Sequence, residues 1–394
     1  MERSEGRGGA REHALSRGEA VAPHAPRVWL VVGEKPGDNA QIDNVARALG
    51  WAFVEKRVRT QPRWAIAKPR VRPSLGHIDR ERSDPLEPPW PDLIITAGRR
   101  LSSVALWIKR QSGGRTRVVV VGKPRGMLDA FDLILAAAHY VLPGAPNVLR
   151  YALPLMQVDP RKLEAAAVRW RERLADQPRP LVALFVGGPT GGLRFDPAMA
   201  RDLVAKASES ARAEGGSLAI ATSRRTPPGI VEALRRVCPE DAQLFEFDAE
   251  AGPSGSAYYG LLSLADRFVA TTDSISMMVE VVRLGRPLAL YPLDRAKGRC
   301  ERLLEAIGIL RPRSPQQDPI PGGGLRTQLM DRLGWPIHSR DLTAMPRLLV
   351  EQSLASWVGE PPVRPHRFED DALERITEKI REIVEADASG SPSD

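Results

Sequence analysis

Short apolar runs alternate with amphipathic segments along most of the chain. Each run is bounded by Gly, Pro or polar residues, a pattern that predicts a buried strand followed by a helix. Residues 265–293 show it most clearly, with an apolar strand at 268–270, a polar elbow at 271–274, a helix that ends near Leu284, and a second strand at 287–290. Such a strand-helix-strand unit is typical of a parallel sheet in an α/β protein.

The alternation occurs in two successive series separated by the Pro-containing stretch 176–180. Two β/α series of similar size predict the α/β class with two facing Rossmann-like domains and parallel sheets. The predicted organisation is a disordered tail (1–26), an N-terminal Rossmann-like domain (27–178), a C-terminal Rossmann-like domain (179–358), and a C-terminal helix and tail (359–394). The predicted strands are 27–33, 52–58, 92–96, 117–121, 133–136, 181–186, 217–222, 244–247, 268–270 and 287–290.

Two stretches interrupt this rhythm. Residues 59–90 are rich in Pro and Arg and carry Trp64, His77 and Trp90, and an insert of that length is either functional or disordered. The chain beyond Leu293 predicts helices near 297–307 and 326–333, a helix over 342–357, and a charged amphipathic helix over 367–386.

The charge balance points to an anionic partner. The 394 residues carry a net charge of +8 with a pI near 9.7, which suits a nucleic acid, a phosphorylated small molecule or an anionic membrane surface, or reflects an Arg-rich composition alone. No helix-turn-helix, zinc-finger or RNA-binding aromatic pattern occurs, so nucleic acid is not the expected partner. Cys238 and Cys300 are far apart and predict neither a disulfide framework nor a thiolate metal site.

No apolar run approaches the roughly 18 residues of a membrane-spanning helix. Residues 1–26 also lack the apolar core of a secretory signal. The expected location is therefore cytoplasmic, with any membrane contact peripheral and on the inner face of the cytoplasmic membrane.

Three elbows that follow predicted strands of the second domain carry residues of ligand-binding type. The first has Gly187, Gly188 and Thr190, where glycines would let a phosphate approach backbone N–H groups; a generic tight turn would use the same residues. The second has Ser223, Arg224, Arg225 and Thr226, whose two guanidinium groups suit a diphosphate, unless they are solvated loop arginines. The glycine elbow lacks both the GxGxxG spacing of a dinucleotide fingerprint and the Gly-Lys-Ser/Thr of a P-loop.

The third elbow opens the helix after 271–274. Asp273, Ser276, Met277 and Glu280 are spaced to lie on one helix face, beside Ser274 at the helix start. The alternative is a solvated acidic face with Asp273 or Ser274 as the N-cap. Because elbows after parallel strands meet at one sheet edge, the three together predict a nucleotide-diphosphate site without a metal.

The first domain offers candidates for acid-base chemistry. Glu34 and Asp38 flank a Pro-Gly turn at the start of the first helix, where a carboxylate either caps the helix or acts as a general base. His139 follows a predicted strand and is a second candidate base, although a single histidine also serves structural roles.

Several of these segments together resemble the mitochondrial-fission ELM-like family, which has many bacterial members. The resemblance covers residues from about 27 to about 293. It rests on the motifs VGEKPGDNAQ, TAGRRLSS, VVVVGKPRG, HYVLPGAPNVL, LFVGGPTGG, ATSRRTP, YYGLLSLAD and TTDSISMMVEV. One departure is Ser256-Ala257, where family members often carry Asn-Pro.

That family is similar in turn to GT-B glycosyltransferases such as lipid-A-disaccharide synthase. The resemblance implies that Glu280 holds the ribose, that Gly187 and Gly188 form the donor-side glycine loop, and that Arg224 or Arg225 contacts the diphosphate. The implied function is transfer of a sugar from a nucleotide-diphosphate donor to an envelope or lipid acceptor. The substrate would be the nucleotide sugar, with no permanently bound cofactor.

The sequence leaves two other functions to compare with this one. The first is a GT-B-shaped binding or scaffold protein that retains the nucleotide pocket without catalysing a reaction. Plant members of the family are linked to recruiting a dynamin-type protein, but these residues show no dynamin-binding element. The second is an epimerase with a bound dinucleotide and a Tyr-x-x-x-Lys pair, which neither Tyr258 nor Tyr259 provides.

Overall fold

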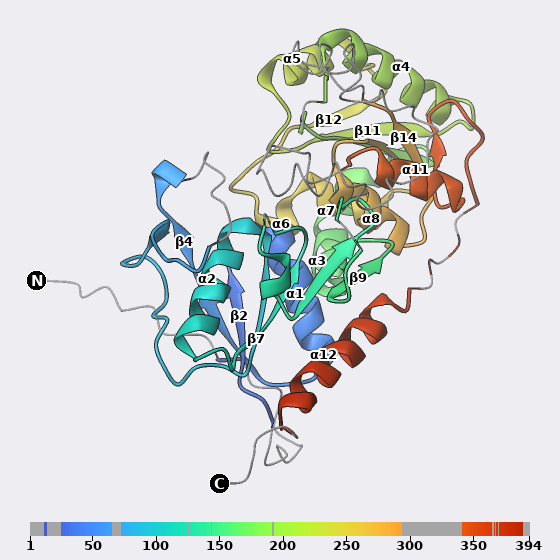
Figure 1. Cartoon of the computed structure of the whole chain (residues 1–394). Helices are drawn as coiled ribbons and strands as arrows, with labels where there is room; N and C mark the ends of the chain where they lie inside the picture. The colour runs from blue at the N-terminus through green and yellow to red at the C-terminus, as the bar shows by residue number, and fades with distance from the viewer. Residues whose placement is uncertain are drawn as a thin grey trace, which may run out of the picture. The chain divides into compact units, whose positions relative to one another are not determined.

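The computed structural model describes residues 12–13, 25–64, 72–124, 126–142, 144–190, 193–293, 341–364, 366, 368 and 370–388. The described residues up to 156 form one compact unit with residues 341 and 370–388. The described residues from 157 to 293 and from 342 to 368 form the other. Figure 1 shows the elements of both along the colour ramp.

A largely parallel sheet lies at the centre of the first unit. Its described strands run in the order β1-β3-β2-β6-β7-β8-β9, and every pair is parallel except β1 with β3. The strands β2, β6 and β8 are buried at each position, as expected for strands covered on both faces. The bounds are β1 (Glu12–His13), β2 (Val28–Val32), β3 (Phe53–Arg57), β6 (Leu93–Ala97), β7 (Arg117–Val121), β8 (Leu133–Ala137) and β9 (Val148–Tyr151).

Helices cover this sheet, and one of them comes from the far end of the sequence. The helix α1 (Pro36–Leu49) follows β2, and α2 (Gly98–Gln111) follows β6. The helix α12 (Ala372–Ala388) packs against α1 through Ile376 and Ile380, which belong to the same core. Two short 3-10 helices, η1 (Pro62–Trp64) and η2 (Leu128–Ala130), and the antiparallel pair β4 (Arg59–Thr60) and β5 (Ile78–Asp79) complete the unit.

The second unit contains a parallel sheet whose described strands run in the order β12-β11-β10-β13-β14-β15. The central strand β10 is wholly buried and pairs with β11 on one side and β13 on the other. The carboxyl ends of these three strands are therefore neighbours. The bounds are β10 (Leu181–Val186), β11 (Ser217–Thr222), β12 (Gln243–Phe245), β13 (Arg267–Thr271), β14 (Leu288–Tyr291) and β15 (Ser356–Trp357).

The helices of the second unit begin where the sequence places capping residues. Asp196 caps α4 by accepting hydrogen bonds from the N–H groups of Ala198 and Met199, both at 3.0 Å, and Pro197 occupies the first turn. The helix α3 packs so closely on α7 that a Cβ at Gly260 would overlap the Trp170 ring. The helices are α3 (Pro160–Trp170), α4 (Pro197–Arg212), α5 (Pro228–Val237), α6 (Gly252–Gly255), α7 (Ala257–Leu264), α8 (Ile275–Arg283), α11 (Ala344–Glu351) and the 3-10 helix η3 (Glu172–Leu174).

The predicted class, α/β with two Rossmann-like parallel sheets and a C-terminal helix, is confirmed. The predicted helix over 342–357 is wrong in its second half, because α11 ends at Glu351 and β15 then pairs with β14. The strand β9 was not predicted, and neither was β1, which lies within the segment read as a tail.

The division between the two units differs from the predicted one. Residues 157–178, which contain α3, group with the second unit because α3 packs on α6 and α7. The predicted helices near 297–307 and 326–333 lie outside the described residues.

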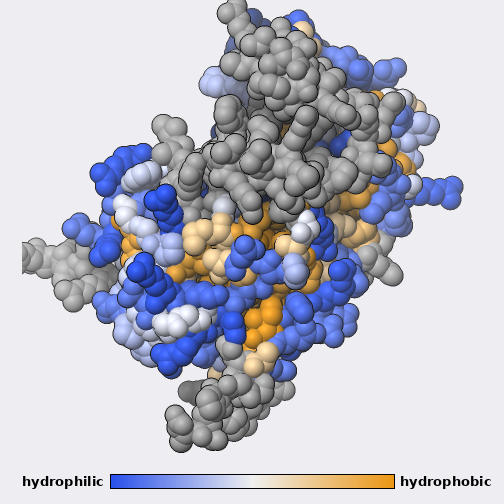
Figure 2. Space-filling view, viewed as in Figure 1, coloured by the Kyte–Doolittle hydropathy of each residue, from blue (hydrophilic) through white to orange (hydrophobic). Residues whose placement is uncertain are grey.

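Figure 2 shows hydrophilic residues over much of the coloured surface in this view. None of the described helices is both long and apolar enough to cross a bilayer.

Candidate functional site

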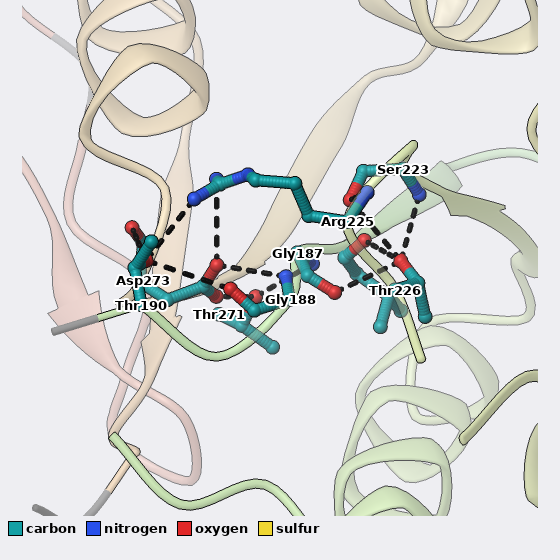
Figure 3. Close-up of polar contacts among 9 residues, drawn as sticks. Gly187, Gly188, Thr190, Ser223, Arg225, Thr226, Thr271 and Asp273 are labelled. Carbon is teal, nitrogen blue, oxygen red and sulfur yellow. Dashed lines mark hydrogen bonds and ion pairs between the residues drawn. The ribbon is translucent and has the colours of Figure 1, made fainter. Parts of the chain in front are cut away.

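Three elbows of the second unit meet at the carboxyl edge of its sheet. They follow β10, β11 and β13, and hydrogen bonds and an ion pair connect them (Figure 3). The structure therefore brings together the three elbows that the sequence predicted to meet at this edge.

The two glycines after β10 are required by close packing between elbows. A Cβ at Gly188 would overlap the backbone carbonyl group of Arg225, and a Cβ at Gly187 would overlap the carboxylate of Asp273. Their N–H groups are already bonded, Gly187 to Thr271 Oγ1 at 2.9 Å and Gly188 to Asp273 Oδ2 at 2.8 Å. These amides, expected to face a phosphate, thus bind the elbow after β13.

Asp273 lies at the buried centre of this cluster. Its side chain is 0% exposed and accepts hydrogen bonds from Gly188 N and from Thr271 Oγ1, the latter at 2.7 Å. Burial raises the pKa of Asp273, whereas the Thr271 hydrogen bond and the charge of Arg225 act in the opposite direction. Asp273 is therefore enclosed by protein and serves as an internal acceptor.

Arg225 lies between that carboxylate and solvent. Its Nη1 donates to Thr190 Oγ1 at 3.0 Å, and its Nη2 lies 3.5 Å from Asp273 Oδ2. The side chain is 40% exposed, so part of the guanidinium group reaches solvent while two of its nitrogens are held. An anchored arginine with outward-facing donors suits an anionic oxygen. The neighbouring Arg224 is exposed.

Ser223 and Thr226 shape the elbow after β11. Thr226 is buried; its Oγ1 accepts from Ser223 N at 2.8 Å and lies 2.9 Å from the carbonyl oxygens of both Val186 and Gly187. Ser223 Oγ accepts from the N–H of Arg225 at 3.3 Å. Both side chains therefore hold the elbow that carries Arg225.

The helix α8 starts beside these elbows without a side-chain cap. Its N-cap residue, Ser274, is buried and makes no capping hydrogen bond, and its first turn carries no acid. Ser276 and Met277 lie in that first turn and are partly exposed. First-turn N–H groups have no intrahelical acceptor, so this end of the helix favours an anion.

Glu280 lies further along α8 and has a partner that the sequence did not reveal. Its Oε2 accepts a hydrogen bond of 2.6 Å from the hydroxyl of Tyr258, in the first turn of α7. Burial raises the pKa of Glu280, while the bond from Tyr258 and the charge of Lys162 lower it. Residues 22 apart on different helices follow no periodicity, so no sequence signal indicated this pair.

The first unit separates its candidate residues. Asp38 is 21% exposed, and its Oδ2 lies 3.8 Å from Lys35 Nζ and 3.4 Å from the Cβ position of Gly98 at the start of α2. Glu34 is exposed in the turn before α1. His139 is buried after β8 against the Tyr140 ring, with centroids 4.2 Å apart, and β6 and β7 lie between β8 and the strand that leads to Asp38.

Asn39 is a further residue that the sequence interpretation missed. Its amide bonds the N–H and the carbonyl of Gly33, at 3.1 and 2.8 Å, and so fixes the turn that carries Glu34. The described residues contain no group of three or more His, Cys, Asp or Glu side chains arranged to hold a metal ion.

Two Rossmann-like units, one with ligand-type elbows at the carboxyl edge of its sheet, define an α/β protein of the two-domain Rossmann-like class. Within that class, the family described as Mitochondrial fission ELM1 matches residues 36–317. The chain belongs to this family.

Individual relatives are distant. The chain is 25% identical over 246 residues to Mitochondrial fission protein ELM1 of Arabidopsis thaliana, an alignment that covers 56% of this chain and 57% of that protein, and so less than two thirds of the relative's length. It is 23% identical over 295 residues to the uncharacterized protein RP120 of Rickettsia prowazekii (strain Madrid E), covering 67% and 82%. Among solved structures, the S. aureus MnaA-UDP co-structure is similar with a TM-score of 0.45 and 11% identity, covering 93% and 99%.

Proposed function

We propose that the second unit binds a nucleotide-diphosphate sugar at its three elbows, and that the protein transfers the sugar to an envelope or lipid acceptor. The observation that carries the proposal is Arg225, which Asp273 and Thr190 hold at the sheet edge with part of its guanidinium group in solvent. A buried carboxylate that orients an arginine leaves the arginine able to bind a second anion.

The remaining residues of the cluster supply complementary groups. The uncapped start of α8, with Ser274, Ser276 and Met277, would receive the diphosphate beside Arg225 and the exposed Arg224. Glu280 would accept hydrogen bonds from the ribose. Departure of the diphosphate would be favoured by the same arginine and helix terminus, because both stabilise developing negative charge.

Transfer also needs a base to take the proton of the acceptor hydroxyl. Asp38 is our choice, with Glu34 and His139 as the other candidates of the first unit. The donor would be a substrate and no permanently bound cofactor or metal would take part. The basic insert 59–90 would contact the acceptor or the inner membrane surface peripherally.

A second function is that of a non-catalytic binding or scaffold protein, and one observation favours it. The N–H groups of Gly187 and Gly188 are satisfied inside the protein, so this loop is complete without a ligand. A scaffold of GT-B shape would retain such a loop for stability alone.

Calorimetric titration with UDP-, GDP- and ADP-sugars tests the proposal on wild type, Glu280→Ala and Arg225→Gln. Loss of a charged hydrogen bond costs about 1.5–3 kcal/mol, so Arg225→Gln should weaken binding roughly ten- to one hundredfold. Arg236→Gln is the matched control, because Arg236 is 75% exposed and pairs with Glu232 on α5.

The outcomes separate the two functions. Binding with release or transfer of the sugar supports the enzyme, and binding without turnover supports the scaffold. If no nucleotide sugar binds, the protein is neither the proposed transferase nor a non-catalytic protein that retains the nucleotide pocket.

A further inference from the structure

Tyr258 is fixed by aromatic packing on the sheet. Its ring lies 4.6 Å, centroid to centroid, from Phe185 of the buried strand β10, and Phe185 in turn packs on Phe268 of β13 at 5.5 Å. The phenol therefore has little freedom to move away from α8. Burial and the neighbouring carboxylate of Glu280 raise the pKa of Tyr258 well above its usual value, so its hydroxyl stays protonated and donates.

The hydrogen bond divides the two oxygens of Glu280. Oε2 accepts from Tyr258 at 2.6 Å. No donor among the described residues bonds Oε1. Oε1 is also not fully buried, so it reaches solvent. One oxygen is thus anchored and the other is available to a ligand hydroxyl.

We infer that Tyr258 is a positioning residue that anchors Oε2 of Glu280 so that Oε1 accepts from a ribose hydroxyl, and that the pair thereby selects ribonucleotides over deoxynucleotides. The inference rests on the proposed nucleotide site and deepens it. Without the anchor the carboxylate can rotate, and a hydroxyl on the ligand no longer finds a fixed acceptor. A site built to bind a hydroxyl rejects an analogue that lacks it, because the acceptor is then left unpaired.

The chain provides a matched control one residue away. Tyr259 is also partly exposed, its ring is 5.4 Å from that of Tyr258, and no hydrogen bond of its hydroxyl occurs within the described part of the chain. Tyr259→Phe therefore makes the same chemical change without touching the anchor.

The experiment uses the full chain and three probes, ADP, GDP and UDP, to find the base that binds most tightly. The 2′-deoxy and 3′-deoxy forms of that nucleotide are then titrated into wild type, Tyr258→Phe and Tyr259→Phe. Wild type and Tyr259→Phe should prefer the ribonucleotide over at least one deoxy form by about tenfold or more, the value of one charged hydrogen bond. In Tyr258→Phe the preference should fall to about threefold or less.

A double-mutant cycle with Glu280→Gln distinguishes an effect of Tyr258 that acts through Glu280 from a general effect of Tyr258→Phe on folding. If Tyr258 acts through Glu280, Glu280→Gln alone should also lower the preference, and Tyr258→Phe should add little on that background. Additive losses, or full discrimination retained in Tyr258→Phe, would overturn the inference while leaving the nucleotide site intact. If no diphosphate binds to wild type, both the inference and the proposed function fail.

Discussion

Of the two acids predicted to share one helix face, only Glu280 lies on α8, because Asp273 precedes the N-cap residue Ser274. Their surroundings differ. Asp273 is enclosed and bonds to Gly188, Thr271 and Arg225, so protein groups use its acceptor capacity. Among the residues that the structure describes, Glu280 is bonded at Oε2 alone. Asp273 therefore supports an arginine, whereas Glu280 keeps an oxygen for a ligand.

Glu280 should make stability depend on pH in a defined direction. Burial raises its pKa in the folded state, so its contribution to stability is fully present below the unfolded pKa near 4.5 and is lost as pH rises through the folded pKa. The free energy of unfolding of wild type relative to Glu280→Gln should thus fall as pH increases from about 4, as measured by urea titration at a series of pH values.

Tyr258→Phe provides the comparison for this pH effect. The hydrogen bond from Tyr258 lowers the pKa of Glu280, so removing it should extend the fall in stability to higher pH. The other charged or titratable neighbours, Lys162 on α3 and Tyr259 on α7, are unchanged in both variants. A wild-type advantage that grows with pH would contradict the assignment.

At the level of elements, the elbows after β10 and β11 interlock through backbone atoms. Gly188→Ala should separate them, since the added methyl group would overlap the carbonyl of Arg225. Overpacking of this kind costs about 1–3 kcal/mol of unfolding free energy, and the displaced Arg225 should also weaken nucleotide binding. Urea unfolding and calorimetry measure the two effects.

Gly229→Ala is the control for Gly188→Ala. Gly229 lies in the first turn of α5, and its Cβ position has no neighbour within 4 Å. Alanine in a helix is favoured over glycine by about 0.5–1 kcal/mol, so this variant should be neutral or slightly more stable. Equal losses in both variants would mean that the steric argument is wrong.

The sequence pattern predicted those helices and strands whose own residues are enough to identify them. Strands such as LVALFV are apolar throughout, and Asp196-Pro197 is a typical pair of N-cap and first helical residues. The sequence pattern did not predict the strands β9 and β15. The segment VLRY contains an arginine and the segment SW has two residues, so pairing with a neighbouring strand decides their conformation. The same holds for Tyr258 and Glu280, which meet only because α7 and α8 belong to one folded unit.

At the scale of the whole molecule, the last described helix, α12, belongs to the first unit although it lies at the other end of the sequence. Ile376 and Ile380 of α12 are 0% exposed within the core that also holds α1, and Arg381 Nη2 donates to the carbonyl of Leu49 at 3.2 Å. The first unit therefore needs residues from both ends of the described chain.

Ile380→Ala should lower the free energy of unfolding by about 2–5 kcal/mol, the usual cost of removing a large aliphatic side chain from a core. Glu378→Ala, on the exposed face of the same helix, should change it by less than about 0.5 kcal/mol. Chemical unfolding followed by tryptophan fluorescence and circular dichroism measures both. A small loss in Ile380→Ala would show that α12 contributes little to the first unit.

The interlocked glycines also bear on how related sequences are compared. Because packing alone demands Gly187 and Gly188, a descendant that had lost every ligand would still be expected to keep them. A search keyed on that glycine pair would therefore recover proteins that share the architecture, whatever they bind. Arg225 and the Tyr258–Glu280 pair, whose outward-facing atoms are surplus to folding, are the positions at which active and inactive branches of a lineage should differ.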